Sequence, residues 1–328
     1  MNSSVLSLRN SRWLFLGGAG FIGSHVLREF MEAGADCYVF DNLVTGLLER
    51  LPLGVEFISA DATNPSEIEN ACNSYEITGV VHFAAYMQAR ESVRDPIKFW
   101  SNNLGASLAL ASILEKTKVN HVIFSSSCSV YGNAQGATEE SPLNPMSPYA
   151  MTKVASEQVL SQATKAAGIH LSILRYFNVI GCGRFPESFD HSEETILPAM
   201  LRMILAGDPP SIFGGDLPTQ DGSAIRDYLD VRDLAHAHLV VACNPQTDQS
   251  VIFNVSSGRP VSVKKIVGEL LEVSGSDLVP TVVSAKEGDP TSVWAVESQQ
   301  LKSLGWSPRY SLRESVQAFW EAFREASG

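Results

Sequence analysis

The sequence predicts an α/β protein: a doubly wound, Rossmann-like parallel sheet with a smaller mixed α/β lid. Three observations predict this fold class. Short apolar runs alternate with helical patterns through the first half of the chain. Those runs are continuous rather than alternating, as expected for strands buried on both faces. A glycine-rich turn joins the first strand to the first helix, which places the expected ligand at the carboxyl ends of the strands.

The first half carries the strands and helices of the sheet. The expected strands are Trp13–Leu16, Cys37–Phe40, Val55–Ser59, Val80–Phe83, His121–Ser125 and Leu171–Arg175. The expected helices are Phe21–Glu32 (stopped by Gly34), one opened by Asn64-Pro65, Lys98–Lys116, and one from Ser147-Pro148 to about Ala167.

The pattern loosens after about residue 179, where stretches rich in Gly, Pro, Ser and acids surround short elements. Val231–Ala242 is an expected helix and Val251–Val255 an expected strand that returns to the main sheet. A capping-box pattern, Ser311 to Glu314, opens the final helix. We therefore expect a cofactor-binding domain at 1–178 with a return segment near 228–258, and a mainly substrate-binding domain at 179–328.

Composition narrows the function classes. The formal net charge of −12 argues against nucleic acid or an anionic membrane as partner. No apolar run approaches the roughly 20 residues of a membrane span, and the first twelve residues lack an apolar signal core. The five cysteines form no close pair, which favours free thiols in a reducing cytoplasm, and their spacing predicts no metal site.

A dinucleotide signature follows the first strand. Gly17, Gly20 and Gly23 permit a tight turn and a close backbone approach to a pyrophosphate, and the helix N-terminus supplies N–H groups for it. Asp41 ends the second strand, where a carboxylate accepts from the adenosine ribose and repels a 2′-phosphate, so NAD is favoured over NADP. The alternative for Asp41 is a turn residue. Asp61, ending the third strand, is placed to reach the adenine edge.

A catalytic signature follows further along. Tyr149 and Lys153 are spaced i and i+4, so they share one face of a helix. A nearby ammonium and a positively charged nicotinamide would favour the phenolate, which can then exchange a proton with a hydroxyl. An ordinary aromatic–cation pair is the alternative. Ser127 closes the serine run that ends the fifth strand, where its hydroxyl can share the proton of Tyr149. His82, in an apolar run, is expected to be a core histidine.

These motifs together resemble the extended short-chain dehydrogenase/reductase family, and within it the UDP-glucose (UDP-galactose) 4-epimerases. The matching stretches run in order through nearly the whole chain: GGAGFIGSH from Gly17, DNL from Asp41, VVHFAA from Val80, FSSSCSVYG from Phe124, SPYAMTK from Ser147, LRYFNVIG from Leu174, IFGGDLPTQDGSAIRDYLDVRDLA from Ile212 and EGDP from Glu287.

The resemblance implies a bound NAD and a UDP-sugar substrate. By this likeness, the residues that line the cofactor, besides those named above, are Phe21, Ile22, Asn42, Ala62, Phe83, Ala84, Ala85, Asn102 and Phe177. The residues that face the nucleotide sugar, besides Ser127 and Tyr149, are Asn178, Thr195, Ser211, Ile212, Phe213, Arg226, Lys286 and Val293, with Arg226 on the diphosphate. The family often dimerises through the helices near 98–116 and 148–167, so a homodimer is expected.

Four positions depart from the family pattern. Met87 stands where many epimerases carry a cofactor-contacting Lys, and Thr195 replaces a frequent substrate-binding Asn. Lys286 replaces a frequent Arg, which keeps the charge but loses the bidentate geometry. Val293 is small where some members carry Tyr, which leaves room for an N-acetyl group. The resemblance therefore leaves the sugar open between hexoses, their N-acetylated forms and pentoses.

The expected reaction is NAD-dependent 4-epimerisation of a UDP-sugar through a transient 4-keto sugar. The enzymatic alternatives are a 4,6-dehydratase, a decarboxylase or a reductase. The first two need an added acid or base beside the serine-containing strand end, where this chain has Cys128 and Ser129. A reductase would consume NADH. The alternative from another class is a non-catalytic NAD-binding regulatory protein, which the retained Tyr149 and Lys153 argue against.

Overall fold

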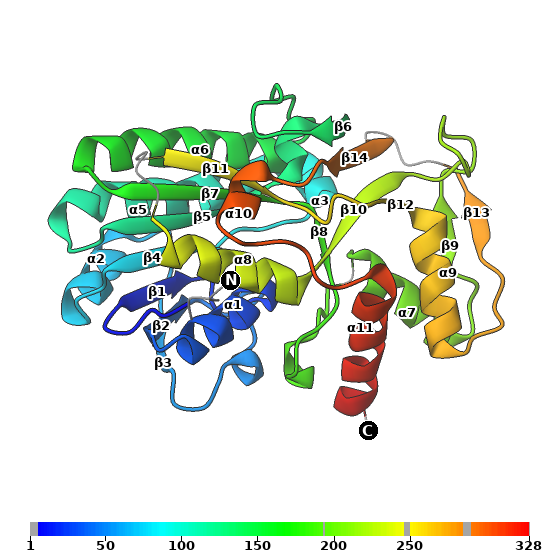
Figure 1. Cartoon of the computed structure of the whole chain (residues 1–328), viewed down its shortest axis with the longest axis horizontal. Coiled ribbons are helices and arrows are strands. Elements are labelled where there is room, and N and C mark those ends of the chain that lie inside the picture. The colour runs from blue at the N-terminus through cyan, green and yellow to red at the C-terminus, as the bar shows by residue number, and fades with distance from the viewer. Residues whose placement is uncertain (1–5, 193, 246–249, 285–289, 328) are drawn as a thin grey trace.

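A seven-stranded parallel sheet forms the centre of the computed structural model, which describes residues 6–192, 194–245, 250–284 and 290–327. The strand order is β11-β7-β5-β4-β1-β2-β3 (Figure 1), and every neighbouring pair is parallel. The strands are β1 Arg12–Leu16, β2 Asp36–Asp41, β3 Glu56–Ser59, β4 Gly79–His82, β5 His121–Ser127, β7 His170–Tyr176 and β11 Ser250–Val255. The predicted fold class is confirmed. The order changes direction between β1 and β4, so a crevice is expected at their carboxyl ends.

Helices cover both faces of the sheet because each strand turns alternate apolar side chains to opposite sides. Trp13 and Phe15 of β1 belong to one core, whereas Leu14 and Leu16 belong to the other. The first core packs against α1 Phe21–Glu32 and α8 Val231–Cys243, and the second against α2 Pro65–Ser74, α5 Gly105–Ile113 and α6 Pro148–Ala167.

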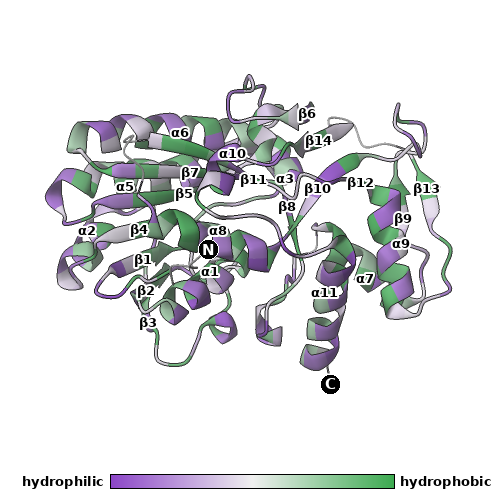
Figure 2. Ribbon diagram, in the orientation of Figure 1, coloured by the Kyte–Doolittle hydropathy of each residue, from purple (hydrophilic) through white to green (hydrophobic). Residues whose placement is uncertain are grey.

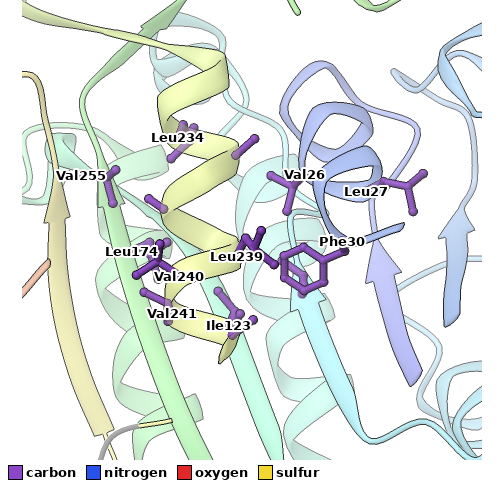
Figure 3. Close-up of a cluster of buried hydrophobic side chains, with 14 of the residues drawn as sticks. Val26, Leu27, Phe30, Ile123, Leu174, Leu234, Leu239, Val240, Val241 and Val255 are labelled. Atoms are coloured by element: carbon purple, nitrogen blue, oxygen red, sulfur yellow. The ribbon is translucent and has the colours of Figure 1, made fainter. Parts of the chain in front are cut away.

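The first core is built where α1 and α8 lie side by side over the sheet. Figure 3 shows Phe30 of α1 directed toward Leu239 of α8, with Ile123 of the sheet beneath them. All three side chains are at most 6% exposed. Dense burial of this kind makes α1 a rigid support, which matters because the glycine-rich turn leads directly into it.

The segment from Ala89 to Lys116 differs from the single long helix predicted at Lys98–Lys116. It contains α3 Ala89–Arg94, α4 Pro96–Phe99, a π-helical turn Trp100–Leu104, then α5 and a 3₁₀ turn Leu114–Lys116. Asp95 interrupts the helical segment between α3 and α4, and from Pro96 to Lys116 the chain is helical without a further break. Turns of the π type are frequent at functional sites, and the one here carries Asn102.

The chain returns to the first domain twice after residue 179. The strand β11 joins the edge of the main sheet beside β7, as the sequence predicts for Val251–Val255. A second return was not predicted: α10 Gln299–Ser303 and the residues after it bring Leu301 and Trp306 into the first core. Trp306 also donates its ring N–H to the carbonyl of Asp233, at 3.0 Å, so it is fixed to α8.

The smaller part of the molecule, on the right of Figure 1, has a core of its own between α7, α9 and α11. Figure 2 shows that α9 and α11 alternate between hydrophobic and hydrophilic residues, as expected for helices with one buried face. Its elements are β6 Ala134–Ala137, β8 Asn178–Ile180, α7 Ile196–Ala206, β9 Ser211–Phe213, β10 Ile225–Asp230, β12 Pro260–Ser262, α9 Val263–Ser274, β13 Thr281–Val283, β14 Ser292–Ala295 and α11 Leu312–Ser327. Within the described ranges, no helix is both long and apolar enough to cross a membrane.

Two small sheets join the parts of the chain. The larger has the order β12-β10-β14-β6, with β8 also paired to β10, and the smaller pairs β13 with β9. The strand β6 comes from the first half of the chain, directly after β5, yet it pairs with β14 from the second half. The end of β5 is therefore held between both parts of the molecule.

Candidate active site

The glycine-rich turn after β1 leaves no space for side chains. Gly17 has φ +81°, and a Cβ there would lie 2.7 Å from the backbone nitrogen of Ala84. A Cβ on Gly23 would lie 2.6 Å from the carbonyl oxygen of Gly17. By contrast, a Cβ on Gly20 meets nothing closer than 3.4 Å. The first and third glycines are therefore required by the chain itself, whereas Gly20 is not.

The helix α1 begins at Phe21 as an anion-binding terminus would. Its N-cap, Gly20, supplies no side-chain hydrogen bond, and its first turn carries no acid. The N–H groups of this first turn, including those of Phe21 and Ile22, and the helix dipole thus point to a negatively charged ligand. This arrangement fits the pyrophosphate of a dinucleotide.

Asp41 ends β2 beside that turn. The carboxylate is 8% exposed and accepts from the backbone N–H of Ala19 at 3.0 Å and of Leu43 at 2.8 Å. Burial raises the pKa of Asp41 above its ordinary value, and these hydrogen bonds oppose the change. Each oxygen accepts one of these bonds and has a second lone pair for a hydroxyl. Asn42 is exposed, and its side chain accepts from the N–H of Val44.

Asp61 follows β3, the edge strand beyond β2. Its carboxylate caps the next turn, accepting from both the backbone N–H and the hydroxyl of Thr63 at 2.8 Å. The residue is exposed, whereas Ala62 beside it is buried. The structure shows a local capping role for Asp61, and the adenine contact stays a prediction.

The carboxyl end of β4 lies against the glycine turn. The N–H groups of Phe83 and Ala84 both donate to the carbonyl oxygen of Leu16, which fixes this segment, with Ala85, against the glycine turn. The ring of Phe83 lies 5.4 Å from that of His238. The other two expected cofactor residues come from elsewhere: Asn102 donates to the side chain of Asn103, and Phe177 is buried after β7.

The start of α6 places the catalytic pair. Ser147 is the N-cap and accepts from the N–H of Ala150, and Pro148 holds the first helical position. Ser92 of α3 accepts from the N–H of Tyr149 at 3.1 Å. One turn later, Lys153 is 4% exposed and its Nζ donates to the carbonyl oxygen of Ser125 at 2.6 Å. That ammonium lies 5.9 Å from the ring centroid of Tyr149.

Burial shifts both groups toward their neutral forms. It raises the pKa of Tyr149 to about 12, and the hydrogen bond from Ser127 opposes this. It lowers the pKa of Lys153 to about 8, and the charge of Glu157 opposes this. Burial is thus the largest influence on the pKa of Tyr149, and the predicted effect of the ammonium together with a nicotinamide ring stays a prediction. A positively charged nicotinamide ring is the further group that would favour the phenolate.

Ser127 lies at the last position of β5, two residues beyond the end that the apolar run predicts. Its hydroxyl accepts from the N–H of Ser129 at 3.1 Å and hydrogen-bonds to Tyr149. The neighbouring Cys128 has a thiol whose pKa is raised to about 12, mainly by burial, so it is neutral. The end of β5 thus offers hydroxyl groups and no ionised group.

Arg226, Val293 and Asn178 lie on the sheet that joins the two parts. Arg226 in β10 is directly opposite Val293 in β14, and its charge lowers the pKa of Cys128, so it lies within electrostatic reach of the catalytic strand end. Val293 is buried in one cluster with Phe177. Asn178 in β8 pairs with Tyr228 of β10. Arg226 therefore lies near the end of β5, and Asn178 lies two residues beyond Tyr176, the β7 partner of Ser127.

The remaining expected substrate residues lie further into the smaller part. Thr195 occupies the N-cap of α7 but donates its hydroxyl to Asp190 at 2.6 Å instead of capping the helix. Ser211, Ile212 and Phe213 form β9, and the guanidinium of Arg90 in α3 lies 6.0 Å from the Phe213 ring centroid. Lys286 lies outside the described residues.

The structure identifies supporting residues that the sequence analysis missed. Ser92 holds the backbone of Tyr149, as described above. Asn103, 3% exposed, bonds both backbone groups of Tyr86 and donates to Thr152 on α6, so it ties the segment after β4 to the catalytic helix. Single polar residues inside helical stretches give no sequence signal of this kind. His82 is a neutral core histidine, as expected. Ser107 hydrogen-bonds to one ring nitrogen, the other has no partner within the described part of the chain, and burial lowers the pKa to about 3.

Residues 13–256 match the NAD dependent epimerase/dehydratase family. The chain is 36% identical to the UDP-glucose 4-epimerase of Lactobacillus helveticus over 311 residues, which cover 92% of this chain and 94% of that one. Two solved structures are also similar. A UDP-glucose 4-epimerase from Stenotrophomonas maltophila with bound NAD and formylated UDP-arabinopyranose superposes with a TM-score of 0.91 at 27% identity, covering 97% of this chain and 99% of that one.

The second structure is the UDP-Glc/GlcNAc 4-epimerase of Campylobacter jejuni, with a TM-score of 0.83 at 32% identity, covering 96% of this chain and all of that one. The similarity to these proteins extends over nearly the whole chain. The chain therefore belongs to the NAD-dependent epimerase/dehydratase family.

Proposed function

We propose that this protein is an NAD-dependent UDP-hexose 4-epimerase, an isomerase that interconverts the two configurations at C4 of a UDP-sugar. The observation that carries the proposal is the hydrogen-bonded pair of Tyr149 and Ser127 at the carboxyl end of β5, with the buried Lys153 one helical turn after Tyr149. Relatives that are similar over nearly their whole length and bear the name UDP-glucose 4-epimerase support it.

The cofactor residues proposed are those of the three strand ends. The glycine turn and the first turn of α1 would hold the pyrophosphate, Asp41 the adenosine ribose, and the Phe83–Ala85 segment with Phe177 the nicotinamide side. Asn42, Asp61, Ala62 and Asn102 would complete the lining, with Lys153 on the second ribose. NAD bound there would supply reversible hydride acceptance.

The chain's own groups would move the proton. Tyr149 accepts the proton of the sugar 4-hydroxyl as C4 is oxidised, and Ser127 shares that proton through its hydrogen bond. The 4-keto sugar turns while its UDP part stays bound, and Tyr149 returns the proton when C4 is reduced from the other face. Net redox change is zero. Cys128 and Ser129 supply no acid for a dehydratase or decarboxylase reaction, since the thiol is neutral.

The UDP part is proposed to bind in the smaller part of the molecule. Arg226 suits the diphosphate because its fork matches phosphate oxygens. Asn178, Thr195, Lys286 and the β9 residues Ser211, Ile212 and Phe213 would hold the remainder. We accordingly propose a functional division at residue 178, with residues 1–178 and the returning segment near 228–258 holding NAD and residues 179–328 mainly holding UDP-sugar.

The sugar pocket is proposed to admit N-acetylated hexoses as well. Val293 is a small side chain packed with Phe177, and a tyrosine there would project into neighbouring space. Val293→Tyr should lose conversion of UDP-N-acetylgalactosamine by at least tenfold more than conversion of UDP-galactose, corresponding to a pocket effect of about 1–3 kcal/mol. Equal losses for the two sugars would contradict this role of Val293.

We further propose a cytoplasmic homodimer. The five free cysteines suit a reducing compartment. Leu108 of α5 and Met151 of α6 are 49% and 44% exposed on helices that pack together, which provides apolar surface for a second copy. Leu108→Glu should convert a dimer to a monomer in analytical ultracentrifugation, whereas Leu53→Glu, at a fully exposed loop, should not. A wild-type monomer at micromolar concentration would contradict the proposal.

The decisive experiment is an anaerobic incubation of purified, NAD-loaded protein with UDP-galactose and, separately, UDP-N-acetylgalactosamine, with no NADH added. We expect the 4-epimer of at least one sugar, resolved by chromatography, without a net change in cofactor absorbance. A 4-keto-6-deoxy product, or consumption of added NADH, would replace the epimerase with a dehydratase or a reductase.

A further inference from the structure

Behind the catalytic pair lies a buried ion pair that the reaction does not use directly. Glu157 is one turn after Lys153 on α6, and Arg175 is on β7. The two side chains are 6% and 3% exposed. Arg175 holds the carboxylate as a fork, with Nε donating to Oε1 at 3.0 Å and Nη2 to Oε2 at 2.6 Å. Burying two charges is costly, so the pair is not explained by stability alone.

The ion pair is connected to the strand that ends in Ser127. The hydroxyl of Ser126 donates to Oε1 of Glu157, so the carboxylate holds the residue between Ser125, which accepts from Lys153, and Ser127. Arg175 also donates to the hydroxyl of Tyr131 at 2.8 Å, directly after the same strand end. The end of β5 is thus fixed to both α6 and β7 at the positions next to the proposed catalytic groups.

The carboxylate of the pair also acts on Lys153. Glu157 raises the pKa of Lys153 against the larger effect of burial. Among the described residues, Glu157 is the one group whose negative charge raises the pKa of Lys153. Burial, together with the charge of Lys153, lowers the pKa of His82 on β4 to about 3, so this histidine is neutral. Cys128 is a neutral thiol, and burial raises the pKa of Tyr176 on β7 and of Tyr131 after β5.

We propose that the Glu157–Arg175 ion pair is a positioning device for the catalytic pair: it fixes the end of β5 against α6 and supplies the negative charge that keeps Lys153 an ammonium. The inference rests on the proposed roles of Tyr149, Lys153 and Ser127. In this proposal Glu157 and Arg175 contact neither the sugar nor the cofactor, and they act through Lys153 and the end of β5.

Two variants separate charge from shape. Glu157→Gln keeps the side-chain length and an acceptor for Ser126 but removes the charge and leaves Arg175 buried without a counter-ion. The double variant Glu157→Met with Arg175→Met replaces both charges by apolar groups of similar length, which buried ion pairs often tolerate. Lys165→Gln is the control, because Lys165 is an exposed cation on the same helix.

The measurements are made on NAD-loaded protein. The first is an ultraviolet difference titration of the Tyr149 phenolate, obtained by subtracting the Tyr149→Phe variant. The second is the pH profile of kcat with UDP-galactose. For Glu157→Gln we expect kcat to begin falling at a pH about one unit lower than in the wild type, because Lys153 loses its proton at a lower pH. We also expect the pKa of the Tyr149 phenol to rise, because the ammonium that favours the phenolate is lost. The double variant should shift the pH profile of kcat and the phenolate titration in the same directions but by smaller amounts. Lys165→Gln should leave both curves as in the wild type.

The outcomes distinguish the two proposals. If both variants lower Tm while the phenolate titration and the pH profile stay as in the wild type, the ion pair is only structural. If Glu157→Gln does not fold, the double variant decides, and an unshifted phenolate titration there would overturn the inference. If wild-type protein epimerises no UDP-sugar but the phenolate titration shifts as expected, the proposed function fails and the positioning role stands.

Discussion

At the scale of single residues, Tyr149 is the group on which the proposed chemistry depends. With a pKa of about 12 set by burial, it is protonated at neutral pH, and Lys153, with a pKa of about 8, carries a proton only below that value. We expect kcat to fall as pH rises through about 8, because loss of the ammonium removes a stabilising charge from the phenolate. The measurement is epimerisation of UDP-galactose across the neutral and alkaline range.

The control for that profile is Tyr149→Phe. We expect it to retain bound NAD and to lose roughly 10²–10⁴-fold in kcat at every pH. A Tyr149→Phe variant that keeps the wild-type rate would assign the proton transfer to another group.

Two glycines of the cofactor turn, Gly20 and Gly23, give a second prediction at this scale. Gly23→Ala places a Cβ 2.6 Å from the Gly17 carbonyl, so the turn must move, and both Tm and NAD affinity should fall. Gly20→Ala has 3.4 Å of clearance, so the chain should fold normally but bind NAD more weakly, because the methyl group stands where a pyrophosphate approaches. Thermal melts and NAD titrations of NAD-depleted protein check this. Equal Tm losses in the two variants would be the contrary result.

At the scale of elements, the start of α6 is a prediction of its own. Ser147, two residues before Tyr149, accepts a hydrogen bond from the N–H of Ala150. Ser147→Ala should lower the free energy of unfolding by about 1 kcal/mol and reduce kcat more than it changes KM, since the first turn carries the catalytic phenol. Ser262→Ala, at the N-cap of α9, is the matched control. We expect it to lower the free energy of unfolding measured in urea by a similar amount and to leave kcat unchanged. A loss of kcat in both would mean that the effect is general.

Elements also show where sequence patterns stop being informative. The bounds of α1 agree with the predicted Phe21–Glu32, because a glycine turn precedes it and Gly34 follows it. The helix predicted at Lys98–Lys116 contains a π turn at Trp100–Leu104. The spacing of apolar residues does not reveal this turn, because it is accompanied by tertiary contacts such as the hydrogen bond between Asn103 and Tyr86. Likewise, β6 has little apolar character and is a strand only because β14 pairs with it.

At the scale of the whole molecule, buried histidines couple the fold to pH. Burial lowers the pKa of His25, His82 and His238 to about 4, 3 and 4. The unfolded chain therefore binds more protons below about pH 6.5. Stability should be lost as pH falls from 6.5 toward 4, by up to about 1.4 kcal/mol per group and pH unit. Asp227, with its pKa raised to about 6, opposes this because the folded state takes up its proton first.

His25 tests that expectation. It donates to the carbonyl of Phe21 and accepts from the N–H of Gly183, so it joins α1 to the segment that leads into the smaller part. His25→Gln retains an acceptor for Gly183 but does not titrate, so Tm should fall less between pH 6.5 and 5 than in the wild type. His191→Gln, at an exposed residue, should change that slope less. An unchanged slope in His25→Gln would remove His25 from this account.

The sequence by itself determined the sheet, the glycine turn, Asp41 and the Tyr149–Lys153 spacing, because each depends on local periodicity, on a backbone that only glycine permits, or on two residues one helical turn apart. Tertiary structure alone decided what those groups experience. The pKa of Tyr149 rises although a lysine is near, since desolvation depends on everything packed around it. The second return of the chain at Trp306 and the fork between Glu157 and Arg175 join residues far apart in sequence, and only three-dimensional packing brings such partners together.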